Sequence, residues 1–378
     1  MKKKKMIKKA LFSLSFILVL VACSSDDSTK PEEETNDSFD RQALLVNWAD
    51  NIIVLSYAAF NTETNSLVTA TTTFTENPTV GALQQLRETW IEAYLAFQHV
   101  SMFEIGKAEA LNYRNRVNVY PTNASEIDGL IADGNYDFSL PSTIDAQGFP
   151  AMDYLINGLA SSDEEIITFY TTNENAENYK AYLNTLAETI STLTETVLND
   201  WNNGYRDTFV NNTSSSASGS VDKLANDYVF YYEKALRAGK VGIPAGVFSN
   251  DPLPEKVEAF YKEDISKILA LEALEASQNF FEGKKFDGTS NGESFKTYLA
   301  YLNTIKNGEN LGNLITAQFE TSKSKLEGLN TNFSLQIEND NSKMLTAYNE
   351  LQRNVILLKV DMLQAMDISV DYVDADGD

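Results

Sequence analysis

The stretch QGFPAMDYLING, residues 147–158, combines residue types that could form a functional turn. Gly148 and Pro150 open it, and a short apolar helix is predicted to follow, with Asp153 three residues after the proline. Proline suits the first turn of a helix, where its missing N–H has no intrahelical partner to lose. Asp153 then has two interpretations. It is either a carboxylate that serves a site between helical bundles, or an acid that complements the helix dipole.

Few other residues could take part in catalysis or metal binding. His99 is the only histidine, so a two-histidine zinc helix is excluded, and no nucleophile turn lies near it for a hydrolytic triad. A packed or half-exposed helix residue is the favoured interpretation of His99. No glycine-rich phosphate-binding pattern occurs, so nucleotide binding is not indicated. Asp374, Asp376 and Asp378 have the first part of a calcium-loop spacing, but no residue follows to supply the bidentate Glu, which favours a solvated acidic tail.

The first 22 residues have the pattern of a signal peptide. A lysine-rich start precedes a short apolar run that is too short to span a bilayer. The run ends in LVAC, which resembles a bacterial lipobox and predicts cleavage before Cys23 and lipidation of that cysteine. The alternative is a secretory signal that is cleaved to release the protein. Ser24 after the cysteine is a residue associated in Gram-negative lipoproteins with delivery to the outer membrane.

The net negative charge of the chain limits the classes of partner that it can bind. Removal of the signal peptide takes six lysines, so Lys+Arg falls from 30 to 24 against 54 acidic residues and the net charge becomes −30. Such a surface repels nucleic acid and anionic lipid headgroups. Residues 23–37 are polar and rich in acids, which predicts a disordered tether. The tether is either a plain spacer or a signal for export to the cell surface, so the protein is expected on the periplasmic face or on the cell surface.

Beyond the tether, apolar side chains recur at helical spacing, and alternating strand patterns are scarce. We therefore predict an all-α fold of two antiparallel helical bundles. The first predicted helix carries a stripe from Leu83 to Glu104 and is expected to end at Gly106, and the second is expected to end at Gly239. The stripe residues of the three clearest helices are Leu83, Leu86, Trp90, Tyr94, Phe97, Ser101 and Glu104; Val221, Leu224, Ala225, Tyr228, Tyr232, Ala235 and Leu236; and Met344, Tyr348, Leu351, Val355, Leu358 and Met362.

Residues 211–220, NNTSSSASGS, contain no large apolar side chain and lie near the middle of the mature chain. They predict a flexible connection between an N-terminal bundle, 38–210, and a C-terminal bundle, 221–378. A short echo of aromatic-Lys-x-Tyr-Leu at 178–186 and 294–302 is consistent with a duplicated unit.

Three segments resemble the imelysin family, helical-bundle lipoproteins also described as peptidase family M75 and as iron-regulated proteins. They are RETWIEAYLAFQHVSMFEIG, QGFPAMDYLING, and RAGKVGIPAGVFSNDPLPEKVEAFY with the terminal LLKVDMLQAMDISVDYVDADGD. The family signature is G-x-H-x-x-E at a helix start. Residues i and i+3 share a helix face there, so the histidine and the glutamate can bind one metal ion or share one proton. In the aligned stretch Gly148 matches the glycine, Pro150 stands at the histidine and Asp153 at the glutamate. The turn is kept, and its chemistry is reduced to one carboxylate.

The resemblance implies a role for the remaining charges. We expect Asp153 to face a polar cleft bordered by Glu104 and by Arg237 and Lys240, the basic pair that precedes the family segment VGIPAG. Glu104 ends an inward-facing stripe, where a lone carboxylate is costly unless it is paired. The cleft would suit a hydrated cation or a small carboxylate ligand.

We therefore expect a lipid-anchored imelysin-like binding protein of the outer membrane that acts, without catalysis, in the acquisition of iron or another nutrient. No cofactor is indicated by the residues; iron or another divalent cation is implied only by the resemblance. The first alternative is an M75-type peptidase that acts through carboxylates. The second is a structural adaptor lipoprotein that docks an outer-membrane transporter.

Overall fold

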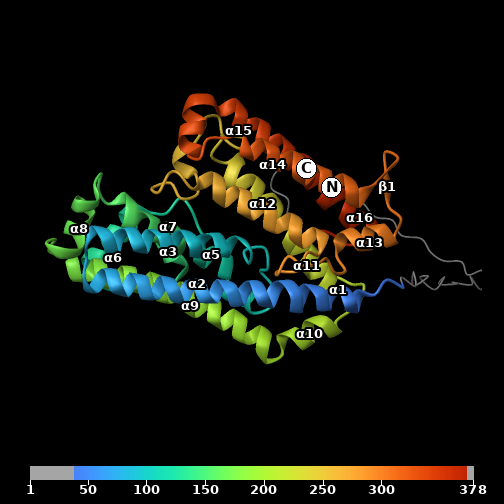
Figure 1. Cartoon of the computed structure of the whole chain (residues 1–378), viewed down its shortest axis with the longest axis horizontal. Coiled ribbons are helices and arrows are strands. Elements are labelled where there is room, and N and C mark those ends of the chain that lie inside the picture. The colour runs from blue at the N-terminus through green and yellow to red at the C-terminus, as the bar shows by residue number, and fades with distance from the viewer. Residues whose placement is uncertain (1–37, 373–378) are drawn as a thin grey trace, which may run out of the picture. The chain divides into compact units, whose positions relative to one another are not determined.

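The computed structural model describes residues 38–372, and the residues of that range from Phe39 onward form one compact unit. The signal peptide, Cys23, the acidic tether and the three C-terminal aspartates lie outside the described residues. Within them the elements are almost all helices, and the strands are a single hairpin of two-residue strands (Figure 1). The prediction of an all-α fold is confirmed.

In the N-terminal half the elements are α1 (Arg41–Trp48), η1 (Ala49–Ile53), α2 (Val54–Glu76), α3 (Val80–Gln98), α4 (Lys107–Leu111), α5 (Tyr113–Val117), α6 (Ala124–Asp133), η2 (Pro141–Ala146), α7 (Gly148–Asp153), η3 (Tyr154–Gly158), α8 (Asp163–Thr171), α9 (Ala176–Asp200), η4 (Trp201–Tyr205) and α10 (Arg206–Asn211). In the C-terminal half they are α11 (Ser220–Phe230), η5 (Tyr231–Gly242), η6 (Pro254–Lys256), α12 (Ser266–Glu282), α13 (Phe295–Tyr301), β1 (Ile305–Lys306), β2 (Glu309–Asn310), α14 (Leu311–Glu327), α15 (Phe333–Val355), η7 (Ile356–Met362) and α16 (Leu363–Ala365). Segments η2 and η6 are 3₁₀ turns, and the other η segments are π-helical.

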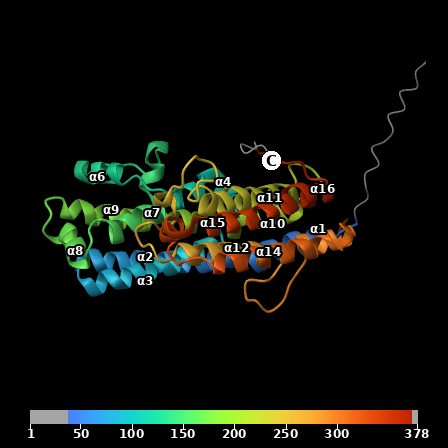
Figure 2. The same ribbon diagram turned by 90° about the horizontal axis from the view of Figure 1, so that it is seen from above.

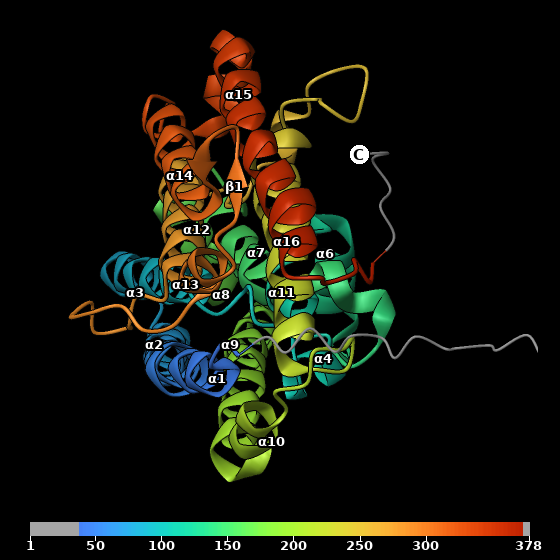
Figure 3. The ribbon, with the colours of Figure 1, turned by 90° about the vertical axis from the view of Figure 1, so that its right-hand side faces the viewer.

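The long helices pack in two groups that lie against each other. Helix α2 packs on α3 and α9, and α14 packs on α12 and α15, while η5 lies against α15 and α3 meets α12. Figures 1 and 3 show the α12, α14 and α15 group lying on the α2, α3 and α9 group, and Figure 2 shows most long helices running along one direction. The predicted connection lies between α10 and α11. The division into bundles at 38–210 and 221–378 stays a prediction.

The predicted apolar stripes form the core. Almost all of their large apolar side chains are buried, among them Trp90, Tyr228 and Leu351. The continuous helix from α1 to α2, Arg41–Glu76, is long and apolar enough by length and composition to cross a membrane. Its contacts with α3 and α9 explain these apolar side chains within the fold.

Two predicted helix ends are wrong. Helix α3 ends at Gln98, not near Gly106, because the next residues include buried side chains at neighbouring positions, Met102 and Phe103 among them, which one helix face could not bury. The second helix runs past Gly239 through η5 to Gly242. Its π-helical turns continue the stripe where a regular α-helix was expected to stop. Glu104 therefore lies in the turn after α3, which decides what it contacts.

Candidate functional site

The turn at 147–158 is built around a glycine that no other residue can replace without strain. Gly148 begins α7 with φ +78°, and a Cβ added there would lie 2.2 Å from the carbonyl oxygen of Val117, at the end of α5. Both the left-handed backbone and the close approach therefore require glycine. Pro150 is the third residue of α7, so it occupies the first turn, as the sequence predicted.

Asp153 is the last residue of α7 and is only 1% exposed. Its Oδ2 accepts a hydrogen bond from the backbone N–H of Tyr261 at 2.9 Å, and its Oδ1 accepts one from Nδ2 of Asn157 at 3.0 Å. Burial raises the pKa of Asp153 to about 7, and these two hydrogen bonds oppose the rise because they favour the charged form. Since α7 has no acid in its first turn, the helix-dipole interpretation of Asp153 is wrong. The carboxylate instead links α7 to the segment that follows η6.

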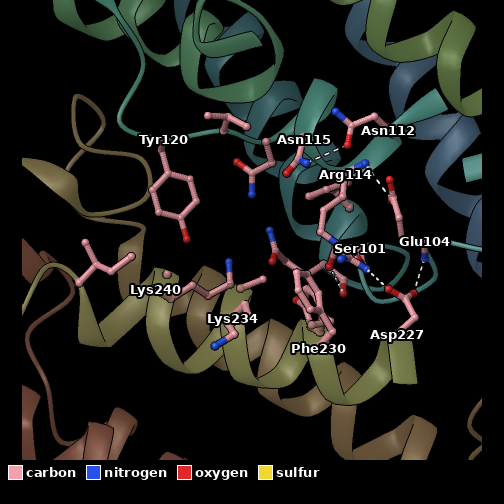
Figure 4. Close-up of a pocket in the computed structure, with 18 of the residues that line it drawn as sticks. Ser101, Glu104, Asn112, Arg114, Asn115, Tyr120, Asp227, Phe230, Lys234 and Lys240 are labelled. Atoms are coloured by element: carbon pink, nitrogen blue, oxygen red, sulfur yellow. Dashed lines mark hydrogen bonds and ion pairs between the residues drawn. The ribbon is translucent and has the colours of Figure 1, made fainter. Parts of the chain in front are cut away.

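Pro150 and Asp153 line a cavity of about 190 Å³ between the start of α7 and the segment around Tyr261. A larger cavity of about 490 Å³ shares Tyr120 and Pro121 with it. Figure 4 shows this larger cavity, with η5 along one side and the segment that contains α5 along the other. Its lining residues are Phe97, Gln98, Ser101, Glu104, Asn112, Arg114, Asn115, Asn118, Val119, Tyr120, Pro121, Asp227, Phe230, Tyr231, Lys234, Ala235, Gly239, Lys240, Ile243 and Lys256.

Glu104 lies at one end of the large cavity, beside Arg114 and Asp227 (Figure 4). Nη2 of Arg114 lies 2.8 Å from Oδ1 of Asp227, and the backbone N–H of Glu104 donates to Oδ2 of Asp227 at 2.5 Å. The Glu104 carboxylate accepts the backbone N–H of Arg114 at 2.9 Å, near the start of α5. Burial raises the pKa of Glu104 to about 7 and raises the pKa of Asp227, while the guanidinium of Arg114 opposes both shifts.

Lys240 lies at the other end, on η5, and is 3% exposed. Its ammonium forms an ion pair with the carboxylate of Glu258, which is 2% exposed. The second oxygen of Glu258 accepts Nδ2 of Asn118 at 2.8 Å, and Oδ1 of Asn118 accepts the hydroxyl of Tyr94 at 2.5 Å. Burial lowers the pKa of Lys240, and the charge of Glu258 opposes that shift. The chain of contacts from Lys240 to Tyr94 ties η5 to α3 through the α5 segment.

Arg237 lies one turn before Lys240 and is not among the residues that line the large cavity. Its Nη1 donates to the hydroxyl of Tyr348 at 2.5 Å, and its Nη2 lies 3.5 Å from the buried carboxylate of Glu233. The guanidinium also lies over the rings of Phe248 and Tyr348, at 5.6 and 5.3 Å from their centroids. The structure thus brings Glu104 and Lys240 to one cavity, Asp153 to its smaller neighbour and Arg237 to the interface of η5 with α15.

His99 follows α3 and faces Glu272 of α12, with its Nε2 2.6 Å from the carboxylate. Its side chain is 31% exposed, in agreement with a half-exposed histidine. Among residues 38–372 no group of three or more His, Cys, Asp or Glu side chains could hold a metal ion.

The charged partners of the cavity, Arg114, Asp227 and Glu258, are absent from the residues predicted from sequence. Asp227 is 123 residues from Glu104, and Asn118 is 140 residues from Glu258. Such pairs leave no periodic signal along the chain. The one available indication for Asp227 is that it adjoins Tyr228, a residue of the buried stripe of α11.

We expect Asp153 and Glu104 to make stability pH-dependent. Each has a folded pKa of about 7, whereas the unfolded chain titrates near ~4. The folded state therefore binds more protons between pH ~4 and ~7, so the free energy of unfolding falls as pH rises through this window. Asp153→Asn should reduce the pH dependence of the free energy of unfolding, measured by urea unfolding at several pH values. The control Asp133→Asn, at an exposed position, should leave that pH dependence unchanged. A variant that keeps the wild-type slope would contradict the role of Asp153.

Comparisons with known proteins agree on the fold. A family model described as Imelysin, peptidase M75, matches residues 53–357. An imelysin-like protein from Psychrobacter arcticum has a TM-score of 0.68 at 15% identity, covering 88% of this chain and 97% of that one. An iron-regulated protein A precursor from Parabacteroides distasonis has a TM-score of 0.67 at 14% identity, with 85% and 95% covered. At such identities these structures show a common fold alone. No curated protein matches the chain.

Proposed function

Because the chain belongs to the imelysin family, we propose that it is a lipid-anchored, non-catalytic binding protein of the cell envelope that acts in the acquisition of iron or another nutrient. The observation that carries this proposal is the cavity of about 490 Å³ between η5 and the α5 segment. Its size is that of a small-molecule site, and a few polar groups converge at its two ends. Its ligand is held by the protein and handed on, with no bond made or broken.

The altered family turn supports a binding role over proteolysis. Pro150 stands where the family has its histidine, so the turn holds no imidazole to act as a base beside Asp153. Both oxygens of Asp153 already accept hydrogen bonds from Tyr261 and Asn157. These contacts make Asp153 a link between segments of the fold. The turn supports the site through its shape.

The link to iron rests on the family and on the iron-regulated structural relative. Since the described residues contain no cluster of metal-ligating side chains, we propose that any iron arrives as a complex whose organic part fills the cavity. The alternative nutrient is an organic molecule without metal. Both belong to the same physical class of ligand, a small molecule with polar groups at its ends.

A specific observation favours the runner-up, a carboxylate-based peptidase. The pKa values of Asp153 and Glu104, each about 7, lie where a general acid or base works best. Glu104 lines the large cavity and would be the acid–base group of such an enzyme. The two proposals therefore differ in one measurable property, the turnover of peptide bonds.

The test uses protein purified from the membranes of its native host. We expect mass spectrometry under native conditions to detect a bound small molecule or metal complex, and we expect no cleavage of a broad peptide library at pH 5–8. Glu104→Gln, with Glu109→Gln as the matched control, separates a true activity from a contaminating protease. Cleavage that Glu104→Gln abolishes and Glu109→Gln retains would replace the binding function with the peptidase.

The proposed location is the outer membrane, on its periplasmic face or on the cell surface, with a transporter in the same membrane as the proposed partner. The location rests on the lipobox at Cys23 and the apolar run before it. It gives the ligand a short path from capture to uptake.

Cys23→Ala should abolish lipidation and leave the protein unprocessed or soluble. The reason is that Cys23 is the only cysteine of the chain and the only residue of the lipobox that can carry a thioether-linked lipid. Fractionation with metabolic labelling by a fatty-acid analogue measures the outcome, and Ser24→Ala serves as the control. A labelled, membrane-bound Cys23→Ala protein would refute the anchor.

A further inference from the structure

We propose that the large cavity takes a small zwitterion, a molecule with an ammonium group at one end, an apolar body, and a carboxylate at the other end. This inference rests on the proposed binding function and names the chemical class of its ligand. It follows from three features of the cavity wall: a surplus of acceptors at one end, apolar side chains in the middle, and ammonium and hydroxyl donors at the far end.

The acceptor end contains more negative than positive charge. The guanidinium of Arg114 forms its ion pair with Asp227, whereas the carboxylate of Glu104 accepts the backbone N–H of Arg114. Two carboxyl groups therefore lie beside one guanidinium in a buried place. Burial of a carboxylate without a full positive partner is unfavourable. A ligand ammonium near this pair would balance the charge and supply three N–H donors.

Gln98 gives independent support at the same cavity. Its side chain is 1% exposed, and its Nε2 donates to the backbone oxygen of Tyr94 at 3.1 Å. Its Oε1 is buried and has no hydrogen-bond partner among the described residues. A buried acceptor that lacks a donor costs about 1–3 kcal/mol. Gln98 lines the cavity close in sequence to Ser101 and Glu104, so a rotation of its side-chain amide would offer this acceptor to an ammonium of the ligand.

The middle of the cavity is apolar and aromatic. Phe230, Tyr231 and Ala235 lie between Asp227 and Lys240 along α11 and η5, and they line the cavity there. These surfaces gain from contact with a hydrocarbon body and gain nothing from a compact, fully hydrated ion. The ligand therefore separates its charged ends by an apolar stretch.

The far end presents donors. Figure 4 shows Tyr120 and Lys240 at the end opposite Glu104 and Asp227. The Lys240 ammonium has three N–H groups and pairs with the Glu258 carboxylate, so further N–H donors remain for a ligand oxygen. Lys256 also lines the cavity. A carboxylate is the acceptor that such a group of ammonium and hydroxyl donors binds best.

The test is calorimetric titration of the mature protein with three matched series. The first series consists of straight-chain ω-amino acids of increasing length, the second of the alkanoates that lack the amine, and the third of the alkylamines that lack the carboxylate. We expect one ω-amino acid to bind best, because its length matches the two ends. The matched alkanoate and alkylamine should bind ~10-fold more weakly or worse, since each loses a hydrogen bond to a charged group. Equal affinity of the three series, or no binding of any ω-amino acid, would overturn the inference.

Variants assign the ends. Gln98→Met and Glu104→Gln should weaken the binding of the ω-amino acid and leave the binding of the alkanoate unchanged. Lys256→Gln should weaken the binding of the ω-amino acid and leave the binding of the alkylamine unchanged. Glu109→Gln, outside this cavity, is the control. If no ω-amino acid binds while the protein purified from its host carries another small molecule, the ligand is not a zwitterion and the proposed binding function stands. Peptide turnover would instead remove the function itself.

Discussion

Gly148→Ala should destabilise the protein more than any other single methyl group added at the candidate site. At φ +78° an alanine is strained by about 1–3 kcal/mol. Its Cβ would also lie 2.2 Å from the carbonyl oxygen of Val117 and 2.6 Å from the carbon of the same group. Both atoms belong to the backbone at the end of α5, so α5 or α7 must shift, which adds about 1–3 kcal/mol. The expected total is ~2–6 kcal/mol.

Gly81→Ala is the matched control. Gly81 is the second residue of α3, and an added Cβ there meets nothing within 4 Å. Because alanine favours helix over glycine by up to ~1 kcal/mol, this variant should be as stable as the wild type or slightly more stable. The midpoint of chemical unfolding measures both variants. A Gly148→Ala protein as stable as Gly81→Ala would show that the turn can move freely, and the family glycine would lose its structural explanation.

The second large effect is expected from the ion pair between Lys240 and Glu258. Both side chains are almost fully buried, at 3% and 2% exposure. Lys240→Met removes the cation and leaves the Glu258 carboxylate in a buried place, where the amide of Asn118 donates to one of its oxygens. Loss of one member of a buried pair costs about 3–5 kcal/mol, because the remaining charge is not compensated. We therefore expect the free energy of unfolding to fall by ~3–5 kcal/mol.

A double variant tests the reason for that loss. Lys240→Met combined with Glu258→Gln removes both charges and keeps an oxygen for Asn118, so it should regain about half or more of the lost stability. Lys323→Met, which breaks the half-exposed pair with Glu275, should cost less than ~1 kcal/mol. Chemical unfolding compares all three. If the double variant is less stable than Lys240→Met alone, the buried charge is not the cause, and the packing of the lysine stem explains the loss.

The shape of the candidate turn could be predicted because its determinants are local. Gly148 and Pro150 limit their own backbone dihedral angles, and the residues that follow them are apolar. What Asp153 does could not be predicted from the same stretch. Its partner Tyr261 lies 108 residues away, and the bond uses a backbone N–H that every non-proline residue carries.

The ends of the helices show a similar limit. The stripe from Leu83 to Phe97 has the correct period, and those side chains are buried in α3. Ser101 and Glu104 continue the same period, yet they lie in the turn after the helix. Periodicity alone cannot distinguish an inward-facing helical position from a loop position that tertiary contacts bury. The donation from the Glu104 backbone to Asp227 decides the matter, and it is a contact with α11.

The sequence by itself determined the all-α class, the buried stripes and the turn formed by Gly148 and Pro150, because helical period and backbone limits act over a few residues. Only the tertiary structure decided which charges meet. Glu104 joins Arg114 and Asp227, and Lys240 joins Glu258, while Arg237 turns to Tyr348. A charged side chain on a helix has the same local pattern whether it faces water or a partner. Its environment depends on which helices pack together, and that packing is set by the whole apolar surface of the chain.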